Sequence, residues 1–369
     1  MKILMIARET LYTSPGGDTV QIVSTAKYLR LLGLTVDIKL TTESIDYKEY
    51  QLIHFFNVIR PDDILCHIEK TNLPFVVSTI FVDYSEYEKK NRKGLLKLLA
   101  KVFNGDQIEY LKTVARLIKN GNRVNSFRYL ISGHSASVKY VAKKAKFLLP
   151  NSVSEYRRFV KKYKFAIPYF KVTNAIDVNI FKANITPLES FRDHVICVGR
   201  IEGRKNQLNL IKALKDTNLR LTIIGKPSPN HISYFRECKK IVDSCSNMQI
   251  IEHIEQKELP AIYAAAKVHV LPSWFETTGL STLEAAAMGC NIVVTRKGDT
   301  EEYFSDFAYY CDPENIKSIK ETVIEAYNAP KNPNIKTHIF QNFNWEIAAK
   351  ETLLAYKAAL EKWDLNDIK

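Results

Sequence analysis

Short apolar segments alternate with helical stretches along this chain of 369 residues, and the alternation runs through the chain twice. The segments that read as strands are rich in β-branched and aromatic residues. In the first run they are KILMIA (2–7), TVDIKL (35–40), LIHFF (52–56), PFVVSTIFV (74–82) and KFLLP (146–150), and in the second HVICVGR (194–200), RLTIIG (220–225), MQII (248–251), KVHVLP (267–272) and NIVVT (291–295). This βα alternation is typical of parallel sheets with helices on both faces. The sequence therefore predicts an α/β protein with two doubly wound, Rossmann-like domains.

A polar, turn-forming stretch, ANITPLES (183–190), separates the two runs. We expect an N-terminal domain over residues 1–180 and a C-terminal domain over residues 190–343. The last segment, 344–369, begins with an amphipathic helical pattern and is expected to pack back on the N-terminal domain. Ligands of open parallel sheets bind at the carboxyl ends of the strands. We therefore expect the two domains to face each other across a central cleft that holds the ligand.

The formal net charge of +13 is concentrated in one segment of the first half. Residues 86–164 contain 20 lysines and arginines against 5 aspartates and glutamates, whereas the rest of the chain contains 33 against 35. Such a segment indicates an anionic partner, which could be a membrane, a nucleic acid or an acidic polymer. Alternatively, it is a solvated surface that keeps the protein soluble.

Within this segment, the stretch 91–103 sets lysines such as Lys93, Lys97 and Lys101 beside leucines. The stretch 106–120 repeats the mixture, and helices of this kind can lie on an anionic bilayer. An amphipathic core helix with a basic solvent side explains the same pattern. A nucleic-acid partner is disfavoured because we find no RNA-recognition or helix-turn-helix motif.

Other features restrict the class of protein. No apolar run reaches the 18 residues of a spanning helix, and the start of the chain reads as a first strand rather than as a signal peptide. The six cysteines are scattered without a CxxC pair, so we expect reduced, mostly buried thiols and no metal site. These features predict a cytoplasmic protein, with peripheral attachment to the inner face of a membrane as an open alternative.

The stretch FETTGLSTLEAAAMG (275–289) carries two glutamates, Glu276 and Glu284, on either side of a glycine turn. It follows a predicted strand, and a helix is expected to begin near Gly279 and to end at Gly289. Backbone N–H groups at a helix N-terminus bind anions, and carboxylates bind hydroxyl groups. The pattern therefore suits a ligand with hydroxyls on both sides of a phosphate, such as a nucleotide sugar. Alternatively, Glu276 is only an acid at a helix N-terminus and Glu284 a surface residue.

Two further loops carry groups that suit a diphosphate. In VGRIEGRKNQ (198–207), Arg200 leaves a strand and Lys205 precedes a helix, with Arg204 a weaker candidate; each could also be a solvated surface residue. In SPGGD (14–18), Gly16 and Gly17 would let the backbone approach a phosphate closely, although a plain flexible turn explains them as well. Neither loop has the GxGxxG or GKS/T pattern of dinucleotide and ATP sites.

Together these motifs resemble the retaining GT-B glycosyltransferases of family 4 (glycosyl transferases group 1). The resemblance rests on FETTGLSTLEAAAMG, VGRIEGRKN, IIGKP, LLPNSVSEYRRF and VTNAIDVNIF. It implies that Arg200 and Lys205 hold the donor diphosphate, that Glu284 binds the ribose, and that Glu276 lies beside the sugar hydroxyls. It also implies which residues make the remaining contacts with the donor. These are the backbone of Thr278, Gly279 and Leu280 for sugar and phosphate, Gly16 and Gly17 for the diphosphate, and His253 and Ile254 for the base.

The chain departs from the family at one place. The family often has a histidine after the strand that matches residues 73–81, and here the nearest ionisable group is Asp83, with Glu86 behind it; His54 is another possibility. We therefore expect Glu276, Arg200, Lys205 and Asp83 to act in catalysis.

The resemblance implies a retaining, metal-independent transfer of sugar from a UDP- or GDP-type donor to a hydroxyl, with no cofactor beyond the donor. The acceptor could be a lipid-linked sugar in surface polysaccharide or glycoconjugate synthesis. A nucleotide-sugar epimerase of the same fold and a basic nucleic-acid-binding protein remain the alternatives.

Overall fold

The structure, a computed structural model, describes residues 1–82, 84–91, 105–120, 126–182 and 184–364. The chain divides into two compact units, which we describe separately. Unit 1 contains residues 1–173 together with 345–369, and unit 2 contains residues 174–344. Each unit has its own sheet and its own hydrophobic core.

Unit 1 is built on a five-stranded sheet in the order β2-β1-β3-β4-β5, in which every pair is parallel. The strands are β1 (Lys2–Ala7), β2 (Thr35–Leu40), β3 (Leu52–Phe56), β4 (Phe75–Ser78) and β5 (Phe147–Leu149). The helices are α1 (Gly17–Leu31), α2 (Pro61–Ile68), α3 (Ser85–Asn91), α5 (Gly105–Asn120), α6 (Phe127–Lys144), α7 (Val153–Tyr163) and α15 (Trp345–Asp364). All residues of β3, β4 and β5 are buried, as expected for strands covered on both faces.

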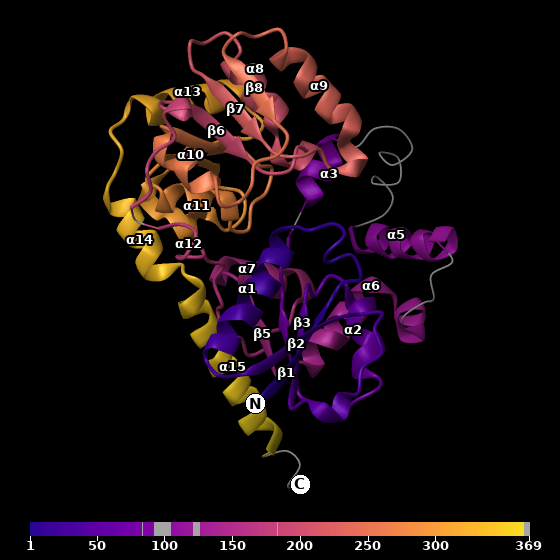
Figure 1. Cartoon of the computed structure of the whole chain (residues 1–369). Helices are drawn as coiled ribbons and strands as arrows, with labels where there is room; N and C mark the ends of the chain where they lie inside the picture. The colour runs from indigo at the N-terminus through magenta and orange to yellow at the C-terminus, as the bar shows by residue number, and fades with distance from the viewer. Residues whose placement is uncertain (83, 92–104, 121–125, 183, 365–369) are drawn as a thin grey trace. The chain divides into compact units, whose positions relative to one another are not determined.

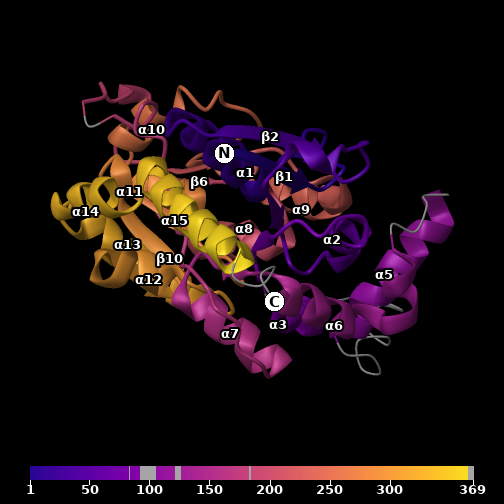
Figure 2. The ribbon, with the colours of Figure 1, turned by 90° about the horizontal axis from the view of Figure 1, so that it is seen from below.

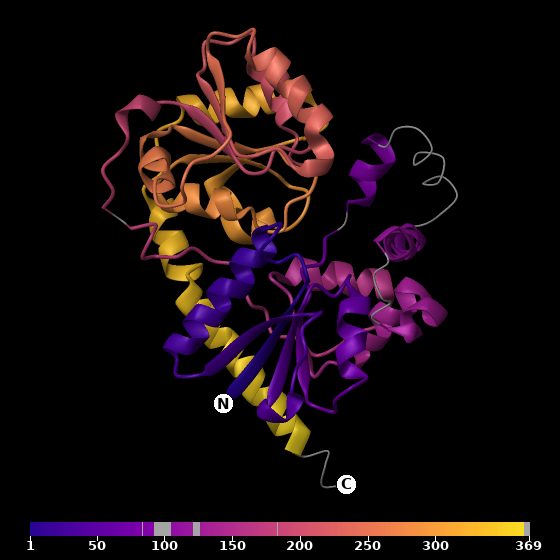
Figure 3. The same cartoon turned by 45° about the vertical axis from the view of Figure 1, so that its right-hand side comes forward.

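Helix α15 returns to unit 1 after the chain has completed unit 2 (Figure 1). It packs against α1 and lies along β4 and β5 (Figure 3). Its Tyr356 hydroxyl lies 2.7 Å from Nδ1 of His54 on β3, and Nε2 of His54 lies 2.8 Å from the Ser78 hydroxyl on β4. This buried chain of hydrogen bonds joins the last helix to the centre of the first sheet.

The described part of the basic segment over residues 86–164 includes helices α5, α6 and α7. Helix α6 packs against α2, and α5 packs against α6 (Figure 2). Lys93, Lys97 and Lys101 lie outside the described residues, as do the rest of 92–104 and residues 121–125. No helix in the described part of the chain is both long and apolar enough to cross a membrane.

Unit 2 is built on a six-stranded parallel sheet in the order β11-β10-β9-β6-β7-β8. The strands are β6 (Val195–Val198), β7 (Leu221–Ile224), β8 (Met248–Ile251), β9 (Val268–Leu271), β10 (Asn291–Thr295) and β11 (Ala308–Cys311). The helices are α8 (Gln207–Leu214), α9 (Ile232–Val242), α10 (Leu259–Ala265), α11 (Leu280–Ala287), α12 (Thr300–Phe304), α13 (Ile316–Asn328) and α14 (Asn334–Asn342). Helices α8, α9 and α13 cover one face and α10 and α11 the other (Figure 3).

The predicted fold class is confirmed, because both units are doubly wound parallel sheets. The six cysteines are unpaired and five of them are buried, which agrees with the prediction of free thiols. The second sheet also contains a strand that the sequence did not predict, β11, at its edge.

Candidate functional site

The order of strands in unit 2 defines where its ligand site should lie. From β6 the chain proceeds to β7 and β8 on one side of the sheet and then to β9, β10 and β11 on the other. The loops after β6 and β9 therefore diverge at a topological switch point, where open α/β sheets bind their ligands. These two loops, residues 199–206 and 272–279, contain five of the site residues predicted from the sequence: Arg200, Lys205, Glu276, Thr278 and Gly279.

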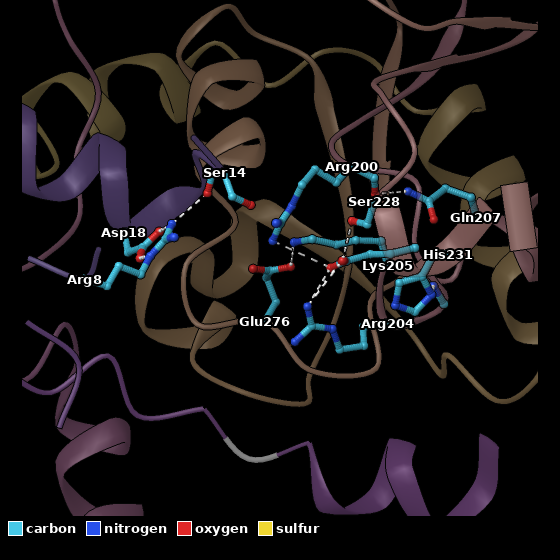
Figure 4. A network of polar contacts seen from close by, with 12 residues as sticks. Arg8, Ser14, Asp18, Arg200, Arg204, Lys205, Gln207, Ser228, His231 and Glu276 are labelled. Atoms are coloured by element: carbon cyan, nitrogen blue, oxygen red, sulfur yellow. Dashed lines mark hydrogen bonds and ion pairs between the residues drawn. The ribbon is translucent and has the colours of Figure 1, made fainter. Parts of the chain in front are cut away.

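An ion pair joins the two loops at this point. Nζ of Lys205 lies 2.6 Å from Oε2 of Glu276, and the two side chains are 23% and 10% exposed (Figure 4). Lys205 ends a short 3-10 helix, η3 (Gly203–Lys205), which begins one residue after Glu202. The backbone N–H of Trp274 also donates to the carbonyl of Arg204 at 3.0 Å. The structure thus brings together two of the residues predicted to act in catalysis.

A third loop, after β10, holds Glu276 from its other side. The Glu276 N–H donates to the Lys297 carbonyl at 3.0 Å, and the Asp299 N–H donates to the Glu276 carbonyl at 2.9 Å. Between them Gly298 has φ of +120°, and a Cβ atom there would lie 1.9 Å from the Glu276 carbonyl oxygen. Only glycine permits this close approach. Gly298 was not predicted from the sequence, where its signal is a glycine shortly after the strand NIVVT.

Helix α11 begins where the sequence predicted, with Gly279 as its N-cap residue and Gly289 at φ of +87° just after its end. Leu280 is its first residue, so the first N–H groups of this helix lack a carbonyl partner one turn earlier. The Thr278 hydroxyl accepts a hydrogen bond from Nδ2 of Asn174 at 3.0 Å, and Thr278 is buried. Asn174, which lies in the VTNAIDVNIF stretch of the sequence, therefore holds the loop before α11.

Glu284 lies on α11 one turn after its start and is half-buried. The phenol of Tyr263 on α10 donates to its Oε2 across 3.4 Å. Removal from water raises the pKa of Glu284 to about 7, although the hydrogen bonds from Tyr263 and Gln256 favour the ionised form. The position suits a carboxylate that accepts hydrogen bonds from ligand hydroxyls. Tyr263, which is fully buried, orients this carboxylate through its hydrogen bond.

Arg200 lies near the start of the same loop, residues 199–206, and its side chain is 47% exposed. Its Nη2 atom is 4.0 Å from the carboxylate of Glu202, and Nη2 of Arg204 is 3.2 Å from the same oxygen. Glu202 itself is buried. Glu202 was not predicted from the sequence, because an acidic residue in a basic loop has no local pattern that marks it as buried.

In unit 1, Gly16 and Gly17 lie at the N-terminus of α1, with Gly16 as the N-cap residue. Arg8, at the end of β1, holds the loop before them through hydrogen bonds to the Asp18 carboxylate at 2.6 and 3.1 Å and to the Ser14 carbonyl at 2.8 Å (Figure 4). Burial would raise the pKa of Asp18, but the hydrogen bond and charge of Arg8 lower it below its ordinary value. Arg8 gives this glycine loop a defined conformation, and it was not predicted from the sequence.

The remaining candidates belong to other parts of the chain. His253 and Ile254 follow β8 at the edge of the sheet, where His253 is exposed and its Nε2 lies 3.1 Å from Glu255, whereas Ile254 packs against the core. Asp83 lies outside the described residues. His54 is 1% exposed and its ring is held by Tyr356 and Ser78, so it offers no surface to a substrate.

We found no group of three metal-ligating side chains among the described residues. The ionic groups that converge in unit 2 are instead the cations of the Lys205 loop and the carboxylate of Glu276. Such an arrangement can hold an anion at the cations and hydroxyl groups at the carboxylate.

Comparison with known proteins agrees with this geometry. Residues 182–338 match the family model described as Glycosyl transferases group 1. The chain is 24% identical over 184 residues to O-antigen chain mannosyltransferase B of Escherichia coli and 28% identical over 182 residues to D-inositol 3-phosphate glycosyltransferase of Pseudarthrobacter chlorophenolicus. These alignments cover 46% of this chain and 46% and 43% of the relatives, so the chain spans about half the length of the curated relatives it matches.

Solved structures match over nearly the whole chain. Sucrose-phosphate synthase from Thermosynechococcus elongatus has a TM-score of 0.72 at 15% identity, with 97% of this chain and 98% of that chain covered. Anabaena Alr3699/HepE in complex with UDP-glucose has a TM-score of 0.68 at 14% identity, with 96% and 100% covered. The two parallel sheets thus have the GT-B fold, and residues 182–338 are similar to the glycosyl transferases group 1 family.

Proposed function

We propose that this protein transfers a sugar from a nucleoside-diphosphate sugar to a hydroxyl group of an acceptor, with retention of configuration. The observation that carries the proposal is the pair formed by Lys205 and Glu276 at the switch point of the second sheet. It sets a cation for the diphosphate directly beside a carboxylate for the sugar. The match of residues 182–338 to the family model of glycosyl transferases group 1 supports the same reaction.

The leaving group of this reaction is a nucleoside diphosphate, which gains negative charge as the glycosidic bond stretches. Lys205 and Arg200 would bind that charge together with the N-terminus of α11 at Gly279. Groups that are already in place before the reaction stabilise developing charge most effectively, by several kcal/mol. The Lys205 loop is in place because Trp274 and Glu276 hold it through hydrogen bonds.

The two glutamates would bind the hydroxyl groups at either end of the diphosphate. Glu276 would accept hydrogen bonds from the sugar and Glu284 from the ribose. In the retaining reaction the acceptor hydroxyl attacks the anomeric carbon on the face that the diphosphate leaves, and a phosphate oxygen takes its proton. Gly16 and Gly17 of unit 1 would contact the diphosphate, and His253 and Ile254 the base.

UDP-sugars are the first donors to test, because the structure of Alr3699/HepE contains UDP-glucose. The experiment is a thermal-shift screen of UDP-, GDP- and ADP-sugars, followed by assay of the stabilising donor with lipid-linked and free sugar acceptors. We expect one donor to raise the melting temperature and nucleoside diphosphate to be released only when an acceptor is present. Stabilisation by none of the donors would overturn the proposal, and a changed donor sugar without an acceptor would identify an epimerase instead.

We further propose that the basic segment of unit 1 holds the protein on an anionic membrane, where a lipid-linked acceptor would lie. In the described part of this segment, Phe127 and Ile131 on α6 are 74% and 73% exposed, beside the cation of Arg128. Exposed apolar side chains next to cations suit the interface of an anionic bilayer. Sedimentation with vesicles of phosphatidylglycerol and phosphatidylcholine tests this directly.

We expect the protein to sediment with these vesicles, and the variants Phe127→Ser/Ile131→Ser and Lys93→Glu/Lys97→Glu/Lys101→Glu to remain in the supernatant. Vesicles of phosphatidylcholine alone are the control for charge. A parent protein that binds neither kind of vesicle would exclude the membrane role and leave the transferase proposal intact.

A further inference from the structure

A buried carboxylate lies in the middle of the most basic loop of unit 2. Glu202 is 3% exposed, although Arg200, Arg204 and Lys205 are its near neighbours in the chain. Its carboxylate accepts hydrogen bonds from the Ser228 hydroxyl at 2.9 Å and from Nη2 of Arg204 at 3.2 Å, and lies 4.0 Å from Nη2 of Arg200. Two guanidinium groups therefore converge on one carboxylate.

A carboxylate in such a position is costly unless its partners keep it ionised. Burial would raise the pKa of Glu202, but the charges of Arg204 and Arg200 lower it below its ordinary value, with further contributions from Ser228 and Lys205. The carboxylate is thus an anion that the surrounding cations stabilise, and it in turn determines where those cations lie.

The backbone around Glu202 is held rigidly. Ile201, which is fully buried, accepts a hydrogen bond from the Ser228 N–H at 3.2 Å, and the Gly203 N–H donates to Nδ1 of His231 at 3.4 Å. The Lys205 N–H donates to the Glu202 carbonyl at 2.9 Å. These contacts anchor the loop after β6 to the loop after β7, so the carboxylate occupies a defined position beneath the basic side chains.

Arg204 is well placed to act as a further cation of the site. It precedes Lys205 in η3, and its carbonyl accepts the Trp274 N–H that ties this loop to the loop of Glu276. Its side chain is 32% exposed, so the guanidinium is accessible to a ligand while Glu202 holds one edge of it. An arginine whose guanidinium group is already held in place loses less conformational entropy on binding a phosphate than an arginine that is free to move.

We propose that Glu202 is a positioning residue that orients Arg204 and Arg200 toward the donor diphosphate, with Arg204 as a third cation beside Arg200 and Lys205. This inference rests on the proposed function, since it names how that site recognises its diphosphate. Glu202 is too buried to contact the donor and acts through the arginines.

The substitution Glu202→Gln separates two physical effects, because they have opposite signs. Removal of a negative charge from among three cations would strengthen the attraction for a diphosphate if charge alone mattered. If the carboxylate orients the arginines, the same substitution weakens binding, since a neutral amide no longer holds two guanidinium groups. A hydrogen bond to a charged group contributes about 1.5 to 3 kcal/mol, which predicts a loss of about tenfold or more in affinity.

The experiment measures calorimetric affinities of the wild-type protein and its variants for UDP, GDP and ADP and for the matching monophosphates. For the diphosphate that binds most tightly, we expect Glu202→Gln to lose about tenfold in affinity and the monophosphate to change by less than about threefold. Arg204→Ala should lose a similar amount, and the double variant no more than the larger single loss. The control is Glu189→Gln, which removes a carboxylate from an exposed pair with Arg192 before β6.

Each outcome is decisive. Equal or tighter diphosphate binding by Glu202→Gln at an unchanged melting temperature would overturn the inference and leave the proposed function standing. Equal losses for diphosphate and monophosphate together with a lowered melting temperature would show a purely structural role and also overturn it. A wild-type protein that binds none of the nucleotides would overturn the proposed function together with the inference.

Discussion

Lys205 and Glu276 form an ion pair of 2.6 Å although they lie 71 positions apart in the chain. The contact exists because β6 and β9 are neighbours in the sheet, so that the loops following them meet. In our proposal this pair is the boundary between the part of the site that binds phosphate and the part that binds sugar. Each residue can therefore be tested for a different step.

Substitution of Lys205 by methionine should weaken the binding of nucleoside diphosphate by about ten- to a hundredfold, because a charge-assisted contact is lost. Isothermal titration calorimetry measures this effect. The control is Lys212→Met on α8, which removes the same charge from a side chain that is 38% exposed and lies 3.9 Å from Glu237. Equal affinity of the Lys205 variant and the wild-type protein would exclude Lys205 from the diphosphate site.

Substitution of Glu276 by glutamine should lower turnover by at least about a hundredfold and change nucleotide affinity by less than about threefold. The amide keeps a hydrogen bond to Lys205 but binds sugar hydroxyls less strongly than a carboxylate does. Steady-state kinetics measures the turnover and calorimetry the nucleotide affinity, both on the same preparation of each protein. Glu301→Gln, at an exposed pair with Arg296, is the control, and unchanged turnover of the Glu276 variant would refute its role.

Substitution of Gly298 by alanine should destabilise unit 2 by about 2 to 4 kcal/mol, because the new methyl group meets the Glu276 carbonyl and φ is positive. Activity should fall with stability, since the loop of Glu276 must move. The control is Gly33→Ala, at φ of +86° with no atom within 4 Å of the new Cβ, which should cost only about 1 to 2 kcal/mol. Equal losses in the two variants, measured by chemical denaturation, would contradict a specific clash.

The stability of the protein should fall between pH 5 and pH 8 through Glu284. The pKa of this carboxyl is about 7 in the folded protein, above its ordinary value of 4.5, because burial disfavours the charged form. The folded state therefore binds the proton more tightly than the unfolded chain does, and the resulting stability is complete below pH 4.5 and lost as the pH rises through 7. The side chain of Glu284→Gln does not titrate. As the pH rises from 5 to 8, the melting temperature of this variant should therefore increase relative to that of the wild-type protein. A constant difference between the two would show that the pKa of Glu284 is not raised.

Substitution of Tyr356 by phenylalanine should lower the free energy of unfolding by about 1 to 3 kcal/mol, because His54 would lose a buried hydrogen bond at Nδ1. Burial lowers the pKa of His54 to about 3, so the ring stays neutral and the effect should be the same at pH 6 and pH 8. Chemical denaturation at the two pH values measures it. The control is Tyr327→Phe on α13, where the tyrosine side chain is only half-buried. If Tyr356→Phe lowers the free energy of unfolding no more than this control does, the hydrogen bond does not secure α15.

Local sequence patterns predicted the strands at the centres of both sheets, because strands covered on both faces are short continuous apolar runs between turn residues. They did not predict β11 (Ala308–Cys311), whose first three residues are only half-buried at the edge of its sheet. The run that contains it, FAYYC (307–311), is short and has two tyrosines, so it is less clearly apolar than the runs of the central strands. The start of α11 at Gly279 was predicted correctly, since helix ends follow local turn chemistry.

By itself, the sequence determined the two doubly wound sheets and the loops that carry Lys205, Glu276 and Glu284, because hydrophobic periodicity and turn residues act over a few positions of the chain. Only the tertiary structure decided which of those loops meet. The order of strands sets β9 rather than β8 beside β6, which brings Glu276 to Lys205 and leaves His253 at the edge of the sheet. Burial of Glu202 and the close approach of Gly298 to Glu276 likewise depend on partners that lie far along the chain, and no local pattern specifies such partners.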